Sequence, residues 1–207
     1  MGRSKLIWLL IFSGILNIFL IGYAAQRYYV KSSQKPPLVY QWRRDLLYKD
    51  LPIKETDIVF VGDSETQFFP LDELLPGVKN RGISGDRTKG VYNRLSDILK
   101  WHPKKLFIQV GTNDFSVMPV DSSISYYKKI ILKARSESPG TKVYIQSVLP
   151  RKDDMNSKVV ILNKGLLSIS ETFKLPFIDL YTPMVKDGKL NDKYDCGDGL
   201  HISAAGY

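Results

Sequence analysis

Two spacings of hydrophobic residues alternate along residues 56–180. Short apolar runs, rich in β-branched and aromatic residues, predict strands at 57–61, 78–81, 105–110, 142–148 and 176–180. Between them, apolar residues three and four positions apart predict a helix or turn at 71–75 and helices at 88–101, 122–136 and 157–173. Repeated strand–helix units predict an α/β fold, with a parallel sheet covered by helices on both faces.

The N-terminal part of the chain has a different pattern. Residues 6–25 form an uncharged apolar run after two basic residues, and twenty such residues can just span a hydrocarbon core of about 30 Å. We predict residues 1–25 as a signal anchor, with a cleavable signal peptide as the alternative because Gly22 and Ala24 fit the small-residue rule. Residues 26–55 are predicted as a linker and an outer helix. The short N-terminal tail favours a domain outside the cytoplasm.

Composition narrows the class of protein further. The chain is 43% hydrophobic and 25% charged, which is ordinary for a globular domain, and 30 basic against 21 acidic residues give a net charge of +9. The basic residues form no block, and no zinc-ligand spacing occurs, so no nucleic-acid partner and no metal are predicted. The single Cys196 excludes an internal disulfide, and its closeness to His201 leaves a Cys–His nucleophile as an alternative.

Small and polar residues follow several of the predicted strands. The segments at these strand ends are Gly-Asp-Ser at 62–64, NRGISGD at 80–86, GTND at 111–114 and DGLH at 198–201. Because the carboxyl ends of neighbouring parallel strands meet at one edge, where open α/β sheets bind ligands, we expect these residues to converge. Helix capping and turn formation are the alternative explanations for each exit taken alone.

The converging residues include a candidate nucleophile and base. Ser64 needs a base to accept its proton, and the chain contains two histidines. His102 precedes the third strand and therefore belongs to the opposite edge, whereas His201 lies on the edge of Ser64. Asp198, three residues before His201, is spaced to reach the imidazole Nδ1–H, and Asp195 is a less well-spaced competitor.

An acyl-transfer site also needs donors for the developing oxyanion. Gly82 can expose its backbone N–H without a Cβ in the way. The side-chain amide of Asn113 is a neutral donor at a strand exit, and the backbone N–H of Ser64 lies at a helix start. We therefore predict Ser64, Gly82 and Asn113 as the oxyanion hole.

Together these motifs resemble the SGNH, or GDSL-type, hydrolase family over residues 56–207. The motifs NRGISGD and GTND are most similar to those of the branch that contains platelet-activating-factor acetylhydrolase and bacterial sialate O-acetylesterases. The resemblance implies a flavodoxin-like three-layer sandwich with a five-stranded parallel sheet in the order 2-1-3-4-5. It also implies Ser64 as nucleophile, Gly82 and Asn113 as oxyanion donors, and the Asp198–His201 pair as base.

The sequence departs from the family pattern at two places. Glu65 stands where the family usually has a leucine after Gly-Asp-Ser. The sequence ends at Tyr207, where the family continues into a C-terminal helix, so we expect that helix to be missing and His201 to be poorly anchored.

These residues predict a serine esterase for short-chain acyl esters, most readily O-acetyl esters, of an extracytoplasmic glycan or related compound. The short connections leave little sequence for a lid over a long acyl chain. The predicted partners are the ester substrate and, through the N-terminal helix, a membrane; no cofactor is expected. An acyltransferase using the same serine ester is the alternative. A membrane-tethered glycan-binding module is a third possibility, disfavoured because binding needs no base beside a serine.

Overall fold

The computed structural model describes most of the chain: residues 2, 8, 12–14, 16–17, 19–23, 39–75 and 77–207. The chain divides into two compact units, Met1–Trp42 and Arg43–Tyr207. Part of the predicted membrane span at 6–25, and the linker at 26–38, lie outside the described residues. Among the residues that are described, no helix is long and apolar enough to cross a bilayer. The membrane anchor is therefore not confirmed and stays a prediction.

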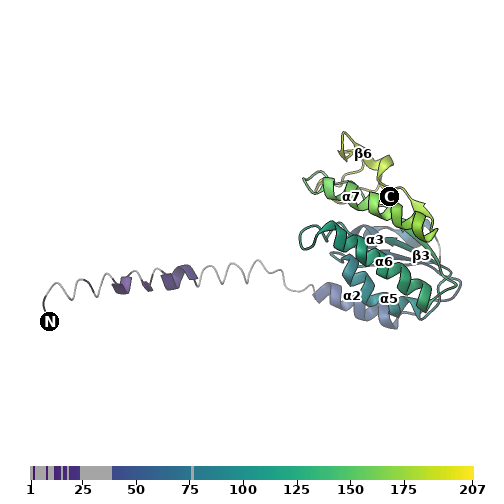
Figure 1. Ribbon diagram of the computed structural model, residues 1–207, viewed down its shortest axis with the longest axis horizontal. Helices are drawn as coiled ribbons and strands as arrows, with labels where there is room; N and C mark the ends of the chain where they lie inside the picture. Colours follow the sequence, from purple (N-terminus) through teal and green to yellow (C-terminus); the bar gives the residue numbers. More distant parts are fainter. Residues whose placement is uncertain are drawn as a thin grey trace. The chain divides into compact units, whose positions relative to one another are not determined.

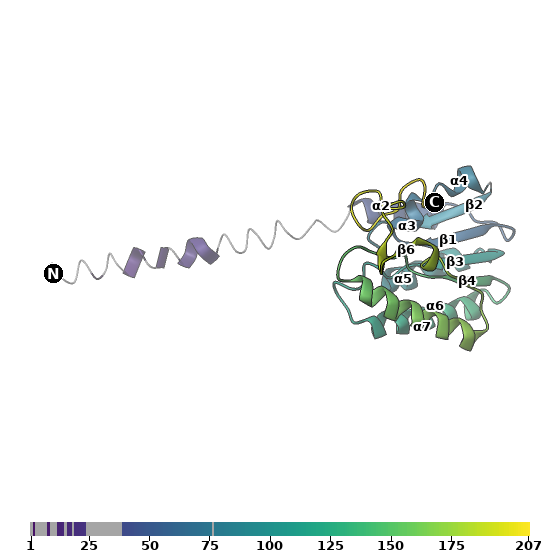
Figure 2. The same ribbon diagram turned by 90° about the horizontal axis from the view of Figure 1, so that it is seen from above.

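A five-stranded parallel sheet forms the centre of the second unit (Figures 1 and 2). The strands are β1 (Ile58–Gly62), β2 (Val78–Gly82), β3 (Lys105–Gln109), β4 (Lys142–Gln146) and β5 (Phe177–Ile178). Their spatial order is β2-β1-β3-β4-β5, as expected from the family resemblance. Only β5 differs clearly from the predicted bounds, since two residues rather than five pair with β4.

Long helices cover one face of this sheet. They are α5 (Thr88–Leu99), α6 (Val120–Glu137) and α7 (Asn156–Phe173), which Figure 1 shows in the order α7, α6, α5 from top to bottom. Alternate strand residues, such as Val59 and Val61 on β1, point into the core between sheet and helices and are fully buried. Helix α2 (Val39–Asp50) adds Tyr48, whose hydroxyl donates to the carbonyl of Gly82 at 3.4 Å.

The opposite face carries two short helices, α3 (Ser64–Phe68) and α4 (Leu71–Leu74). Two glycines at the carboxyl ends of the strands let α3 approach the sheet. A Cβ on Gly62 would lie 2.2 Å from Thr66 Oγ1, and one on Gly82 would lie 2.3 Å from the backbone nitrogen of Gln67. Helix α3, which follows β1, therefore begins directly at the carboxyl edge of the sheet. This start positions Ser64, the first residue of α3.

The C-terminal part folds back over the same edge of the sheet. After the 3₁₀ turn η1 (Thr182–Met184), the strands β6 (Val185–Lys186) and β7 (Lys189–Leu190) form a small antiparallel hairpin that the sequence analysis missed. Residues 191–207 follow as turns, and we call them the C-terminal segment. Its apolar anchor is Ile202, which packs with Leu149 and Leu190 in a second, smaller core.

Candidate active site

The turn between β1 and α3 places Ser64 at the carboxyl edge of the sheet. Asp63 is the N-cap of α3 and accepts a hydrogen bond from the Glu65 N–H at 3.2 Å. Arg94 Nη2 donates to the carbonyl of Gly62 at 3.1 Å and holds the other side of the turn. Burial raises the pKa of Asp63 to about 7. Since Asp63 supplies the cap, the hydroxyl of Ser64 is left free for another partner.

That partner is His201, which the C-terminal segment brings to Ser64 from 137 positions away. His201 Nε2 lies 2.9 Å from Ser64 Oγ, and His201 Nδ1 lies 2.6 Å from Asp198 Oδ2. Ser64 is 3% exposed, whereas the side chain of His201 is 27% exposed, so the imidazole stands between the buried hydroxyl and solvent. The three predicted side chains therefore meet in one hydrogen-bonded row.

Asp198 is held by the same turn that carries His201. Its Oδ1 accepts the backbone N–H groups of Leu200 at 2.9 Å and His201 at 2.8 Å. Burial works to raise the pKa of Asp198, but the hydrogen bonds from the His201 ring and these N–H groups outweigh it and hold the pKa well below its usual range. On the other side of the imidazole, the Phe68 ring packs edge-on at 5.6 Å. The carboxylate that contacts the imidazole is thus Asp198 and not Asp195.

The structure gives the competing residues other partners. Asp195 accepts the N–H groups of two glycines and forms an ion pair with Lys152 at 2.6 Å. Cys196 is exposed, and both ring nitrogens of His201 already face Ser64 and Asp198, so no nitrogen is left for the thiol. Possible metal-ligating atoms of Cys196, Asp198 and His201 lie within 4.8 Å of one another, but a cation there would compete with those two hydrogen bonds.

The second histidine lies elsewhere, as predicted. His102 Nδ1 is 3.1 Å from the hydroxyl of Ser138, in the turn that precedes β3. It belongs to the opposite edge of the sheet and serves as an internal control for the role of His201.

Asn113 lies in the turn after β3 and is fixed against the loop after β2. Its Nδ2 donates to the carbonyl of Asp86 at 3.0 Å, which engages only one of the two amide hydrogens. Next to it, Asp114 accepts from both the N–H and the hydroxyl of Thr88, the latter at 2.6 Å. The two loops therefore form one connected rim, and the second amide hydrogen of Asn113 makes no hydrogen bond to any described residue.

Gly82 does not match the role predicted for it. Its N–H donates to Asn80 Oδ1 at 2.9 Å, so the group is already paired, and its missing Cβ is explained by the close approach of α3. Further along the same loop, Gly85 has a positive φ of 75°, and its N–H makes no hydrogen bond to any described residue. Gly85 precedes Asp86, the residue that holds the Asn113 amide, and sequence reasoning missed it although NRGISGD contains both glycines.

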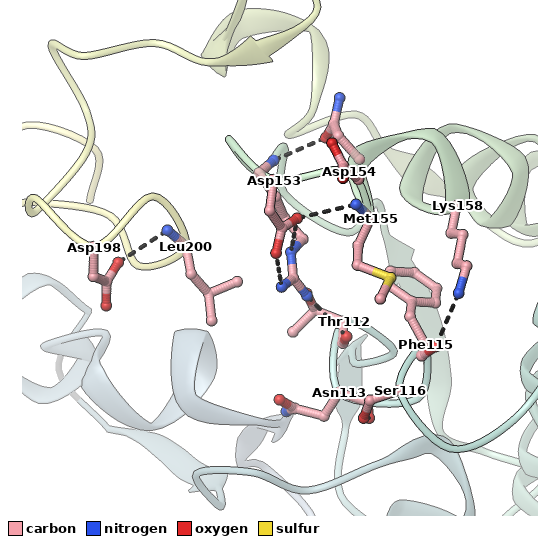
Figure 3. A network of polar contacts seen from close by, with 12 residues as sticks. Thr112, Asn113, Phe115, Ser116, Asp153, Asp154, Met155, Lys158, Asp198 and Leu200 are labelled. Carbon is pink, nitrogen blue, oxygen red and sulfur yellow. Dashed lines mark hydrogen bonds and ion pairs between the residues drawn. The ribbon is translucent and has the colours of Figure 1, made fainter.

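Arg151 holds the turn of Asn113 from the side of α7. Its Nη1 donates to the carbonyl of Thr112 at 3.1 Å and to the Thr112 hydroxyl at 2.9 Å, and its Nε donates to Asp153 at 2.9 Å. Figure 3 shows this network, with Leu200 pointing from the C-terminal segment toward the loop of Thr112 and Asn113. The backbone position of Asn113 is therefore set by a partly buried, charge-assisted contact with the preceding residue.

A small cavity of about 10 Å³ lies beside the nucleophile turn. Its walls come from the turn, from β3 and from the C-terminal segment, and include Glu65, Thr112 and Leu200. A space of this size holds about one water molecule or methyl group.

Comparison with known proteins identifies the class. Residues 69–207 match the model of the GDSL-like lipase/acylhydrolase family, and the chain belongs to this family. It is 28% identical over 177 residues to the platelet-activating factor acetylhydrolase IB subunit alpha2 of Rattus norvegicus, covering 76% of this chain and 74% of the relative. The protein is thus an SGNH hydrolase, a carboxylic-ester hydrolase.

Solved structures agree with this assignment. A Streptococcus pneumoniae protein whose name refers to platelet activating factor is 26% identical, with a TM-score of 0.75 over 87% of this chain and 94% of that one. A GDSL-like lipase from Bacteroides thetaiotaomicron is 27% identical, with a TM-score of 0.71 over 81% and 91%. The family match begins after Ser64, so the assignment of the nucleophile rests on the geometry of the site.

Proposed function

We propose that the protein hydrolyses short-chain acyl esters, most readily acetyl esters, with Ser64 as nucleophile. The observation that carries this proposal is the row of Ser64, His201 and Asp198, joined by contacts of 2.9 Å and 2.6 Å. The proposed substrate is a small or glycan-borne ester outside the cytoplasm. That location rests on the apolar run at 6–25.

The geometry supports a two-step acyl transfer. Ser64 Oγ attacks the ester carbonyl while its proton passes to His201 Nε2, and Asp198 stabilises the imidazolium that forms. His201 then gives this proton to the leaving alkoxide, leaving an acyl group on Ser64. In the second step His201 takes a proton from water, the hydroxide attacks the acyl-serine, and the returning proton frees the Ser64 hydroxyl and the carboxylic acid.

The negative charge on the carbonyl oxygen needs donors in both steps. We propose the N–H of Ser64 at the start of α3, the unused amide hydrogen of Asn113, and the N–H of Gly85 in place of the paired Gly82. Asn113 and Gly85 are joined through Asp86, so the two donors keep a fixed relation to each other.

Asn113→Ala is expected to lower kcat by about 10²–10³-fold with little change in KM, because the donor acts mainly on the transition state. Steady-state kinetics with an aryl acetate measure the effect. Asn93→Ala, an exposed asparagine on α5, is the matched control and should change neither constant. A large rise in KM with kcat intact would make Asn113 a substrate-binding residue instead.

The size of the acyl group is expected to limit turnover. The cavity of about 10 Å³ beside the nucleophile turn, lined by the neighbours of Ser64 in the chain, has room for a methyl group. We therefore expect kcat/KM for p-nitrophenyl esters to fall about tenfold or more from acetate to hexanoate. Measuring the series from acetate to decanoate tests this, and equal or rising rates with chain length would contradict a short-chain preference. Adding a sugar as acceptor distinguishes a hydrolase from an acyltransferase. Only a transferase would form the sugar ester as its main product.

A further inference from the structure

Arg94 is a buried cation close to the nucleophile turn, and the reaction described above does not use it. It lies in the middle of α5, and its side chain is only 7% exposed. Its Nε donates to Asp86 Oδ2 at 2.8 Å, and its Nη2 donates to the carbonyl of Gly62 at 3.1 Å. One guanidinium group therefore contacts both the turn that carries Ser64 and the loop after β2.

Asp86 connects this contact to the proposed oxyanion donors. Its backbone carbonyl accepts the Asn113 amide at 3.0 Å, and it directly follows Gly85, whose N–H is the other proposed donor of this loop. Its own N–H donates to the carbonyl of Ile83 at 2.9 Å, which closes the loop into a tight turn. The position of Asp86 therefore affects two of the three proposed donors.

The beginning of this loop has other anchors. The N–H of Ile83 donates to the carbonyl of Gly62 at 3.0 Å, and the N–H of Ser84 donates to Gln67 Oε1 at 2.8 Å. These contacts fix the first two residues after β2. At the end of the loop, where the proposed donors lie, the nucleophile turn reaches Asp86 through the side chain of Arg94.

The carboxylate of Asp86 is packed closely against the start of α5. The N–H of Arg87 donates to its Oδ1 at 2.9 Å. A Cβ on Gly90 would lie 1.8 Å from the same oxygen, so Asp86 occupies the space that a side chain at position 90 would fill. Glycine inside a helix is less stable than alanine. Its presence at position 90 is therefore explained by the packing of Asp86.

Stability alone is a weak explanation for the ion pair of Arg94 and Asp86. Both side chains are nearly buried, and the cost of removing two charges from water offsets much of their attraction. The geometry suggests another reason. A guanidinium group is planar and donates in fixed directions, so it can hold two acceptors at a set separation, which an ammonium group cannot do.

We propose that Arg94 is a positioning residue that keeps the oxyanion donors Asn113 and Gly85 in a fixed place relative to Ser64, acting through Asp86 and the Gly62 carbonyl. This inference rests on the proposed function of Ser64. The oxyanion forms between the nucleophile and these donors. A change in their separation therefore weakens the hydrogen bonds of the transition state more than the binding of the ester.

The first test is Arg94→Lys, which keeps the charge and loses the fork of donors. With an aryl acetate, kcat should fall about tenfold while KM changes less than about twofold. Arg81→Lys is the matched control, because Arg81 is a buried arginine that donates to the carbonyls of Leu51 and Asn80 instead. It should keep kcat within about twofold even if its Tm falls. A native kcat in Arg94→Lys, or an equal fall in Arg81→Lys, would overturn the proposal.

A double-mutant cycle separates positioning from a general loss of structure. Arg94→Lys is combined with Asn113→Ala, which removes one of the donors that Arg94 positions. In the Asn113→Ala background, Arg94→Lys should lower kcat by less than about threefold, because only the effect on Gly85 is left. An equal fall of kcat in both backgrounds would show that the two residues act independently, and the proposal would be wrong.

Gly90→Ala tests the same contact while Arg94 stays in place. The added Cβ forces Asp86 to move, so kcat should fall about tenfold with KM nearly unchanged, although alanine is the better helix residue. An unchanged kcat would contradict the role of Asp86. Because this variant does not alter the ion pair itself, it keeps the proposal testable if Arg94→Lys fails to fold.

Labelling by a fluorophosphonate distinguishes this inference from the proposed function. The phosphoryl oxygen needs the same donors as the ester carbonyl, so the labelling rate of Ser64 should fall in Arg94→Lys and in Gly90→Ala. If the native protein is not labelled, the proposed function is wrong. If it is labelled and both variants react at the native rate, the role of Arg94 is wrong and Ser64 stands.

Discussion

Ser64→Ala is expected to abolish ester hydrolysis, lowering kcat/KM by roughly 10⁴-fold or more. The reason is the position of its hydroxyl, which is 2.9 Å from His201 Nε2 at the carboxyl edge of the sheet. The fold should survive, because Asp63 rather than Ser64 caps α3, so the substitution removes no helix cap. Thermal unfolding of the variant should therefore stay close to that of the native protein.

A serine-directed fluorophosphonate checks this prediction independently of the substrate. It should label the native protein and fail to label Ser64→Ala. Ser168→Ala, an exposed serine on α7, is the control and should be labelled at the native rate. Labelling of Ser64→Ala at full strength would show that the nucleophile is another residue.

The second large effect concerns the base. His201→Ala should reduce kcat about as much as Ser64→Ala does, since neither residue can act without the other. Asp198→Asn should reduce kcat by about 10³–10⁴-fold, because the amide no longer stabilises the imidazolium or fixes the ring with its Nδ1–H toward position 198. Both effects are measured by steady-state kinetics with an aryl acetate.

A histidine base should also show in the pH dependence, because His201 must be neutral to accept the serine proton and activity should therefore fall at acid pH. The hydrogen bonds that hold the pKa of Asp198 well below its usual range keep its carboxylate charged there. His102→Ala should leave rate and profile unchanged, and its inactivation together with an active His201→Ala would overturn the assignment of the site.

The sheet and the approach of Ser64 to His201 could be predicted from the sequence for one physical reason. Parallel strands end at a common edge, so residues as distant as Ser64 and His201 could be expected to meet once each was placed after a strand. Asp198 followed from local spacing alone. The choice between Asp198 and Asp195 could not be made firmly from spacing, because it depends on Lys152, which takes Asp195 away from the imidazole.

Other features depended on contacts that no local pattern reveals. Gly82 was assigned a free N–H, but the side chain of Asn80 bends back and takes it. The hairpin of β6 and β7 has strands of two residues each, too short for any hydrophobic period to show. From the sequence, Glu65 could be identified only as a departure from the family motif, which usually has a leucine after Gly-Asp-Ser. Its contact with Tyr207, 142 positions away, appears only in the folded chain.

The turn that carries both Asp198 and His201 has a consequence for how activity is lost. Asp198 accepts the N–H groups of Leu200 and His201, so base and carboxylate form one short unit, which meets the nucleophile through the contact of 2.9 Å between His201 and Ser64. When such a segment opens locally, both groups depart together and return together. The catalyst then switches between an assembled and a disassembled form while the sheet stays intact. Mild heat or denaturant would therefore abolish ester hydrolysis reversibly before the whole domain unfolds.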